Sequence, residues 1–127
     1  MIFLETSFLI AFYLKKDVHN KKAVEIEKSL GNRKKIINKT TLCEFLTVLR
    51  KKNLKTNHVK KYYNEILSNV IILDDSEYHN QAIENCLNNE IGFFDNLHHI
   101  TMVENGIKEI ASFDNDFDTF KDIKRIY

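Results

Sequence analysis

Several acidic residues stand singly where short apolar runs end, and together they could hold a cation. Glu5 follows the first apolar run, and Asp95 follows a stretch with two adjacent phenylalanines. Asp114 and Asp116 follow a third run near the end of the chain. Carboxylates at close range cannot all stay ionised without a cation between them, and oxygen ligands select hard cations such as Mg²⁺ or Mn²⁺. Such a site can activate water and stabilise charge on a phosphoryl group.

Each of these acids also has a structural interpretation. Glu5 would be a solvent-facing residue at a strand end, and Asp95 would favour a helix N-terminus electrostatically. The aspartates after residue 112 are typical of turns and caps. Glu44 stands in Thr41-x-x-Glu44, which is the spacing of a capping box, and the spacing alone favours capping over metal binding.

The histidines offer a competing metal hypothesis. Asp95-x-x-His98-His99 would place two ring nitrogens near a carboxylate on one helix. Zinc would normally recruit further histidines or cysteines, and no partner spacing is present. His98 is therefore interpreted as a packed residue or one that faces the site.

The charge of the chain is unevenly distributed along its length. Residues 1–63 hold fifteen Lys and Arg against five Asp and Glu, and residues 64–127 hold four against thirteen, within a formal net charge of +1. Such asymmetry indicates a basic surface for a polyanion beside an acidic cluster, or simply a solvated surface. The candidate residues for contacting a polyanion such as a nucleic-acid backbone are Arg50, Lys51, Lys52 and Lys55.

Short apolar runs alternate with segments of helical period, which predicts a single α/β domain over residues 1–127 with a parallel sheet of four to five strands. The predicted strands are 2–4, 35–37, 70–73, 109–112 and 124–126, and the predicted helices are 7–14, 17–30, 41–52, 56–67, 76–88 and 94–105. Sites in such sheets form beyond the carboxyl ends of the strands. Glu5 and Asp114 should therefore converge if the first and fourth strands are neighbours.

Three further expectations concern packing and capping. The run 70–73 is continuously apolar, which suits a buried strand. Ala82, Ile83 and Leu87 should point inward from their helix. Asp17, Thr56 and the pair Asp74 and Asp75 are predicted to cap the helices that follow them.

Four segments of the sequence resemble the PIN domain, in the small prokaryotic form found in VapC toxins. They are MIFLETSFLIA, TTLCEFLTVL, GFFDNLHHITMVENGIKEI and the Ser-x-Asp-x-Asp-Phe pattern in IASFDNDF. Their order and spacing carry the resemblance over essentially the whole chain. It implies a three-layer α/β/α fold and a metal-dependent endoribonuclease that leaves 5′-phosphate and 3′-hydroxyl ends.

The resemblance also implies roles for individual residues and for partners. The catalytic, metal-binding acids would be Glu5, Glu44, Asp95 and Asp114, with Asp116 as a further ligand and Ser7, Ser112 and His98 in support. It favours metal binding over capping for Glu44. It further implies Mg²⁺ or Mn²⁺, an RNA substrate, a homodimer and a VapB-type antitoxin that inserts Arg or Lys into the acidic pocket.

One departure from the family pattern leaves alternatives open. The family prefers Asp at the position of Glu5, and Mg²⁺ tolerates a longer ligand poorly because it demands near-ideal geometry. A binding module for RNA or protein that no longer cleaves is one alternative, and an RNA-processing nuclease without an antitoxin is another. A phospho-acceptor domain ranks last, because Asp74 or Asp75 followed by Lys108 matches it poorly.

The sequence also predicts where the protein resides. Cys43 and Cys86 form no metal or disulfide framework, which fits a reducing cytosol. No apolar run approaches the ~20 residues that a membrane-spanning helix needs. We therefore expect a cytoplasmic protein with no membrane contact.

Overall fold

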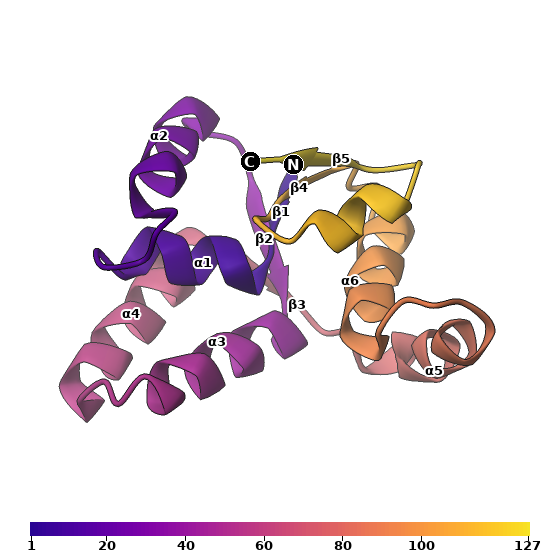
Figure 1. Ribbon diagram of the computed structural model, residues 1–127, viewed down its shortest axis with the longest axis horizontal. Coiled ribbons are helices and arrows are strands. Elements are labelled where there is room, and N and C mark those ends of the chain that lie inside the picture. Colours follow the sequence, from indigo (N-terminus) through magenta and orange to yellow (C-terminus); the bar gives the residue numbers. More distant parts are fainter.

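The computed structural model describes all residues from Met1 to Tyr127 and contains one parallel sheet of five strands in the order β3-β2-β1-β4-β5. Every neighbouring pair of strands is parallel. Helices α1 to α4 lie on one side of the sheet, and α5, α6 and the short helix η2 lie on the other (Figure 1). The expected three-layer α/β/α architecture is confirmed.

The element bounds lie close to those expected from the sequence. The strands are β1 (Ile2–Leu4), β2 (Lys35–Asn38), β3 (Ile71–Leu73), β4 (Glu109–Ala111) and β5 (Lys124–Ile126). The α-helices are α1 (Thr6–Tyr13), α2 (Asn20–Leu30), α3 (Lys39–Lys51), α4 (Thr56–Asn69), α5 (His79–Asn88) and α6 (Phe93–Glu104). Two 3₁₀ helices, η1 (Ser76–Tyr78) and η2 (Asn115–Thr119), complete the chain.

The central strands are buried on both faces, and successive residues of a strand pack into different hydrophobic cores. Ile2 and Leu4 of β1 join the larger core beneath α1 to α4, whereas Phe3 between them joins a second core with Met102 of α6 and Phe117 of η2. This split follows from the alternation of side chains along a strand. α5 is packed against α6 through a third, smaller cluster.

Two packing predictions are wrong. β3 is an edge strand, because only β2 pairs with it, and its residue Ile71 is 46% exposed. On α5 only Ala82 is buried, while Ile83 and Leu87 are exposed. The apolar run misled in the first case because a continuous run does not distinguish a central strand from an edge.

The caps also differ from those predicted. α3 begins at Lys39, and its N-cap is Asn38, whose Oδ1 accepts hydrogen bonds from the Thr41 amide at 2.8 Å and the Thr41 hydroxyl at 2.9 Å. The Thr41–Glu44 capping box is therefore not formed. An Asn at the last residue of an apolar strand competes with Thr as a cap, and it ranks at least as high.

Of the remaining predicted caps, Asp74 caps the helix that follows it, and Asp17, Thr56 and Asp75 do not. Asp17 accepts from the His19 amide and lies outside α2, and Thr56 is the first residue of α4 rather than its cap. Asp74 accepts from the Ser76 amide at the start of η1. Asp75 does not cap its own helix, because its buried carboxylate accepts instead from the Thr40 amide of α3 at 3.1 Å.

The order of the strands places a switch point at β1. From β1 the chain proceeds outward through β2 to β3, then returns to β4 on the other side of β1 and continues to β5. In open α/β sheets the crevice for ligands lies at the carboxyl ends of the strands where the order reverses. Glu5 follows β1 and Ser112 follows β4 directly, so both lie at this position.

Candidate metal centre

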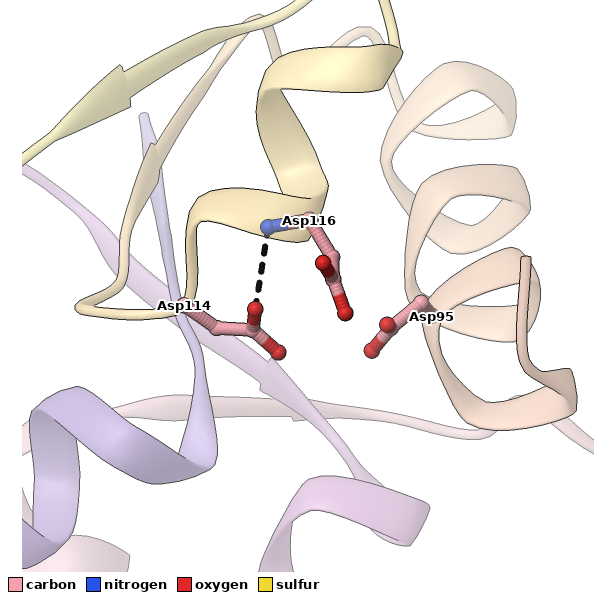
Figure 2. Close-up of side chains that lie close together, drawn as sticks. All are labelled: Asp95, Asp114 and Asp116. Atoms are coloured by element: carbon pink, nitrogen blue, oxygen red, sulfur yellow. Dashed lines mark hydrogen bonds between the residues drawn. The ribbon is translucent and has the colours of Figure 1, made fainter. Parts of the chain in front are cut away.

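Three aspartates converge beyond the carboxyl ends of β1 and β4. Asp95 projects from the first turn of α6, Asp114 lies in the loop after β4, and Asp116 is in η2 (Figure 2). One carboxylate oxygen of each lies within 4.8 Å of those of the other two. The amide of Asp116 donates to Asp114 Oδ1 at 2.9 Å, which fixes the turn that carries both residues.

The electrostatics of this group fit a bound cation. Burial, together with the nearby carboxylates of Asp114, Glu5 and Asp116, raises the pKa of Asp95 to about 6, and His98 opposes the shift. The ionised form of Asp95 is therefore disfavoured, and a positive charge placed beside it would stabilise it. The three converging ligand atoms are carboxylate oxygens, the type that Mg²⁺ and Mn²⁺ prefer.

Glu5 is held by protein hydrogen bonds beside this group. Its Oε2 accepts from the amide of Ser7 at 2.9 Å, from the Ser7 hydroxyl, and from the Ser112 hydroxyl at 2.8 Å. Because each serine donates its only hydroxyl proton to Glu5, each can accept from the loop after β4. Ser7 accepts from the amide of Phe113 at 2.9 Å, and Ser112 accepts from the amide of Asp114 at 3.0 Å.

The consequence is that Glu5 positions the loop that carries Asp114. Ser7 and Ser112 link the carboxylate at the end of β1 to the backbone of the loop that follows β4. Glu5 also caps α1, since its side chain accepts from the first turn of that helix. Its carboxylate is not part of the three-aspartate group, although its charge acts on Asp95.

Glu44 is held by a second set of hydrogen bonds. Its Oε1 accepts from the Thr6 hydroxyl at 3.1 Å and lies 2.9 Å from Nε2 of His98. His98 is 1% exposed, and its Nδ1 lies 3.1 Å from Nδ2 of Asn38. Since the Asn38 amide oxygen accepts from Thr41, Asn38 presents its NH₂ group to the ring.

This arrangement assigns the tautomer of His98. Nδ1 must accept the proton of Asn38, so Nε2 carries the hydrogen and donates it to Glu44. Both ring nitrogens are then engaged by protein groups. His99 is paired instead with Asp122 at 2.8 Å, so the two histidines do not form a zinc site with Asp95.

Sequence reasoning missed Asn38 and Thr6 as members of the site. Asn38 is fully buried and joins the cap of α3 to His98, and Thr6 contacts Glu44 across 38 residues of sequence. A polar residue that ends an apolar strand was the available signal for Asn38. Nothing in the sequence pattern distinguished Thr6.

The predicted RNA-binding residues lie at the far end of α3 from the acids. Arg50, Lys51, Lys52 and Lys55 are all exposed, and Arg50 donates to the Thr56 hydroxyl at the start of α4 at 3.2 Å. Glu44 and Lys51 are seven residues apart on one helix, so about 10 Å separates them along its axis.

Comparison with protein families identifies the class of the molecule. The PIN domain model matches residues 2–123, and the chain therefore belongs to the PIN domain family. No curated protein sequence matches this chain.

No helix in the structure has both the length and the apolar character that a membrane crossing requires.

Solved structures share this fold at low sequence identity. VapC20 of Mycobacterium tuberculosis, described as a toxin that cleaves the sarcin-ricin loop, has a TM-score of 0.83 at 22% identity, with 94% of each chain covered. VapBC2 of Rickettsia felis, bound to a DNA fragment from its promoter, gives 0.75 at 17%, covering 99% of this chain and 98% of that one. FitAcB of Neisseria gonorrhoeae gives 0.69 at 14%, covering 100% and 97%. At these identities the likeness shows the fold.

Proposed function

We propose that this chain is a metal-dependent endoribonuclease and the toxin of a toxin–antitoxin pair. The observation that carries the proposal is the convergence of Asp95, Asp114 and Asp116 at the switch point of a PIN fold. A Mg²⁺ or Mn²⁺ ion bound there would activate water and stabilise negative charge on the phosphoryl group.

The chain's own residues would bind the ion, position its ligands and contact the RNA. The three aspartates would hold the ion, and Glu5 would keep Asp114 in place through Ser7 and Ser112. Glu44, oriented by His98 and Thr6, would face the substrate side with its other carboxylate oxygen. Arg50, Lys51, Lys52 and Lys55 would bind the RNA backbone, as exposed cations do in sequence-independent contacts.

The proposed antitoxin follows from the same acidic group. A guanidinium pairs bidentately with carboxylates, so an inserted Arg would neutralise the aspartates and block the entry of RNA. Toxin–antitoxin complexes among the structural neighbours support a partner of this kind. The proposed complex contains a homodimer of this chain as its other component. Co-expression with a short neighbouring reading frame should yield a complex that does not cleave RNA.

One specific observation favours a second candidate, a module that binds RNA without cleaving it. Oε2 of Glu5 already accepts from three donors, so only Oε1 is free for a metal. A carboxylate fixed in this way serves structure more than catalysis. Under this alternative RNA binding would be indifferent to chelator.

Cleavage of a mixed-sequence RNA panel in Mn²⁺ separates the two candidates. Wild-type protein should cleave, and Asp95→Asn should not, with products ending in 5′-phosphate and 3′-hydroxyl. Asp118→Asn is the control, because Asp118 is an aspartate of η2, two residues from Asp116, that pairs with Arg125 at 2.8 Å and lies outside the cluster. RNA bound equally with and without EDTA, and never cleaved, would favour the binding module.

A further inference from the structure

A groove runs away from the acidic site between α3 and the start of α6. It has a volume of about 330 Å³, which falls within the usual range of ligand sites of ~300–1,000 Å³. Its lining residues are Thr40, Cys43, Glu44, Thr47, Val48, Lys51 and Phe94. Six of these form one stripe along α3, because their spacing follows the helical repeat.

Phe94 forms the opposite wall and is unusual for its type. It is 51% exposed, whereas the adjacent Phe93 is packed into the cluster of Ala82, Leu97 and Ile100. The two rings meet edge to face, with centroids 5.4 Å apart. Phe93 therefore anchors the start of α6, and Phe94 is left with free ring surface directed at the groove.

The groove is continuous with the proposed catalytic site at two points. Glu44 lines the groove and is also held by His98, one helical turn from Asp95. Phe94 directly precedes Asp95, so about 3.8 Å separates their Cα atoms. A nucleotide strand with a phosphate at the aspartates would therefore have Phe94 within reach.

The chemistry along the groove matches a nucleotide strand better than a peptide or duplex. It offers the aromatic ring of Phe94, the hydroxyls of Thr40 and Thr47, the thiol of Cys43 and a lysine at its far end, with Glu44 as its only acid. Exposed aromatic rings beside a cation are how proteins hold single-stranded nucleic acid, by base stacking and phosphate contact. Bases in a duplex are stacked on each other and cannot reach such a ring.

We propose that Phe94 is a stacking platform for an unpaired base next to the scissile phosphate, and that Lys51 contacts a phosphate further along the same strand. The proposal rests on the proposed ribonuclease function and defines its substrate as single-stranded RNA at this position. Base stacking on a protein aromatic ring changes affinity by about 5- to 100-fold on alanine substitution.

The test measures binding apart from cleavage. A short mixed-sequence RNA, single-stranded or annealed to its complement, is titrated into the protein in EDTA. Phe94→Ala should weaken single-stranded binding at least fivefold, Phe94→Leu should do the same because it lacks a ring, and Phe94→Tyr should bind like wild type. Leu87→Ala, an exposed apolar residue on α5, is the remote control and should change nothing.

The two free cysteines give a second readout within the same molecule. Cys43 is exposed and lines the groove, while Cys86 lies on α5 outside it. Single-stranded RNA should slow alkylation of Cys43 and leave Cys86 unaffected, as read by mass spectrometry.

The outcomes distinguish this inference from the function on which it rests. Tight single-stranded binding by Phe94→Ala, or no protection of Cys43, would overturn the stacking site while leaving a nuclease intact. Equal binding of duplex and single strand would also overturn it. A wild-type protein that binds neither RNA would remove both the subsite and the proposed function.

Discussion

His98 donates a hydrogen bond from Nε2 to Oε1 of Glu44 across 2.9 Å, because Asn38 occupies its other ring nitrogen. The buried ring thereby links a strand-end amide to a carboxylate at the mouth of the site. ¹⁵N NMR of the His98 ring should show a protonated Nε2 and an unprotonated Nδ1 at neutral pH. A hydrogen on Nδ1 alone would contradict this arrangement.

Replacing the donor tests the same relationship by mutation. Asn38→Asp keeps the acceptor for Thr41 but loses the donors to His98 and Thr101. We expect Nδ1 to become protonated and the free energy of unfolding to fall by about 1–3 kcal/mol, since buried polar groups lose their partners. Urea denaturation measures the loss, and an unchanged midpoint would show that the network contributes nothing.

Asp95 should make the metal-free protein less stable as the pH rises. Its pKa is about 6 in the folded state and ~3.9 when unfolded, so folding favours the protonated carboxyl. Stability from this group is fully present below pH ~4 and is lost as the pH rises to about 6. Asp95→Asn should therefore raise the free energy of unfolding at pH 7, by roughly 1 kcal/mol after discounting for solvent screening of a half-buried group.

The measurement is urea unfolding in EDTA at pH 4 and pH 7. Asp118→Asn is the control of opposite sign, because the hydrogen bond from Arg125 lowers the pKa of Asp118. That variant should be less stable than wild type at neutral pH. A parallel loss of stability with pH in wild type and Asp95→Asn would contradict the assignment.

Divalent cations should stabilise the fold through the three aspartates. A ligand at a hundred times its Kd adds about 2.7 kcal/mol to the free energy of unfolding. Mn²⁺ or Mg²⁺ should raise the thermal midpoint of wild type, and EDTA should reverse the shift. Asp114→Asn should lose most of this response, so a full response in that variant would place the cation elsewhere.

The charge of Glu5 should be visible in the titration of Asp95. Glu5→Gln removes a negative charge that raises the pKa of Asp95, so that pKa should fall. ¹³C NMR of the side-chain carboxyl groups follows this directly. Ser112→Ala removes a hydrogen bond without removing charge, and it should leave the pKa of Asp95 higher than Glu5→Gln does.

The basic end of α3 should account for the salt dependence of RNA binding. A Lys51, Lys52 and Lys55 triple alanine variant should weaken binding to all sequences and flatten the plot of affinity against salt. A triple alanine variant at Lys21, Lys22 and Lys28 removes the same charge from exposed positions on α2 and is the matched control. Equal slopes in the two variants would assign the effect to net charge alone.

Much of the fold could be predicted from the sequence because alternation and helical period are local signals. The five strands and the convergence of residues after β1 and β4 followed from them, together with the rule that sites lie at carboxyl ends. The exposure of Ile83 and Leu87 could not be predicted, since the helical pattern shows a face but not whether a neighbour covers it.

The acidic residues of the candidate site could be predicted from the sequence, whereas the hydrogen bonds that position its other residues could not. Asp95, Asp114 and Asp116 were singled out by type and position, and the structure brings them together. The capping-box spacing at Glu44 misled, because Asn38 already occupies the Thr41 amide. Such competition depends on contacts between residues far apart in the chain, such as His98 and Asn38, which spacing alone does not reveal.

The pairing of β1 with β4 makes the site a late product of synthesis. Glu5 must wait for Ser112, more than a hundred residues behind it, before the loop that carries Asp114 takes its place. Contacts of such long sequence separation form only when both segments have been synthesised, and they form slowly. A chain synthesised only as far as β4 therefore has no assembled acidic centre, and the centre forms only after the residues that follow β4 have joined the sheet.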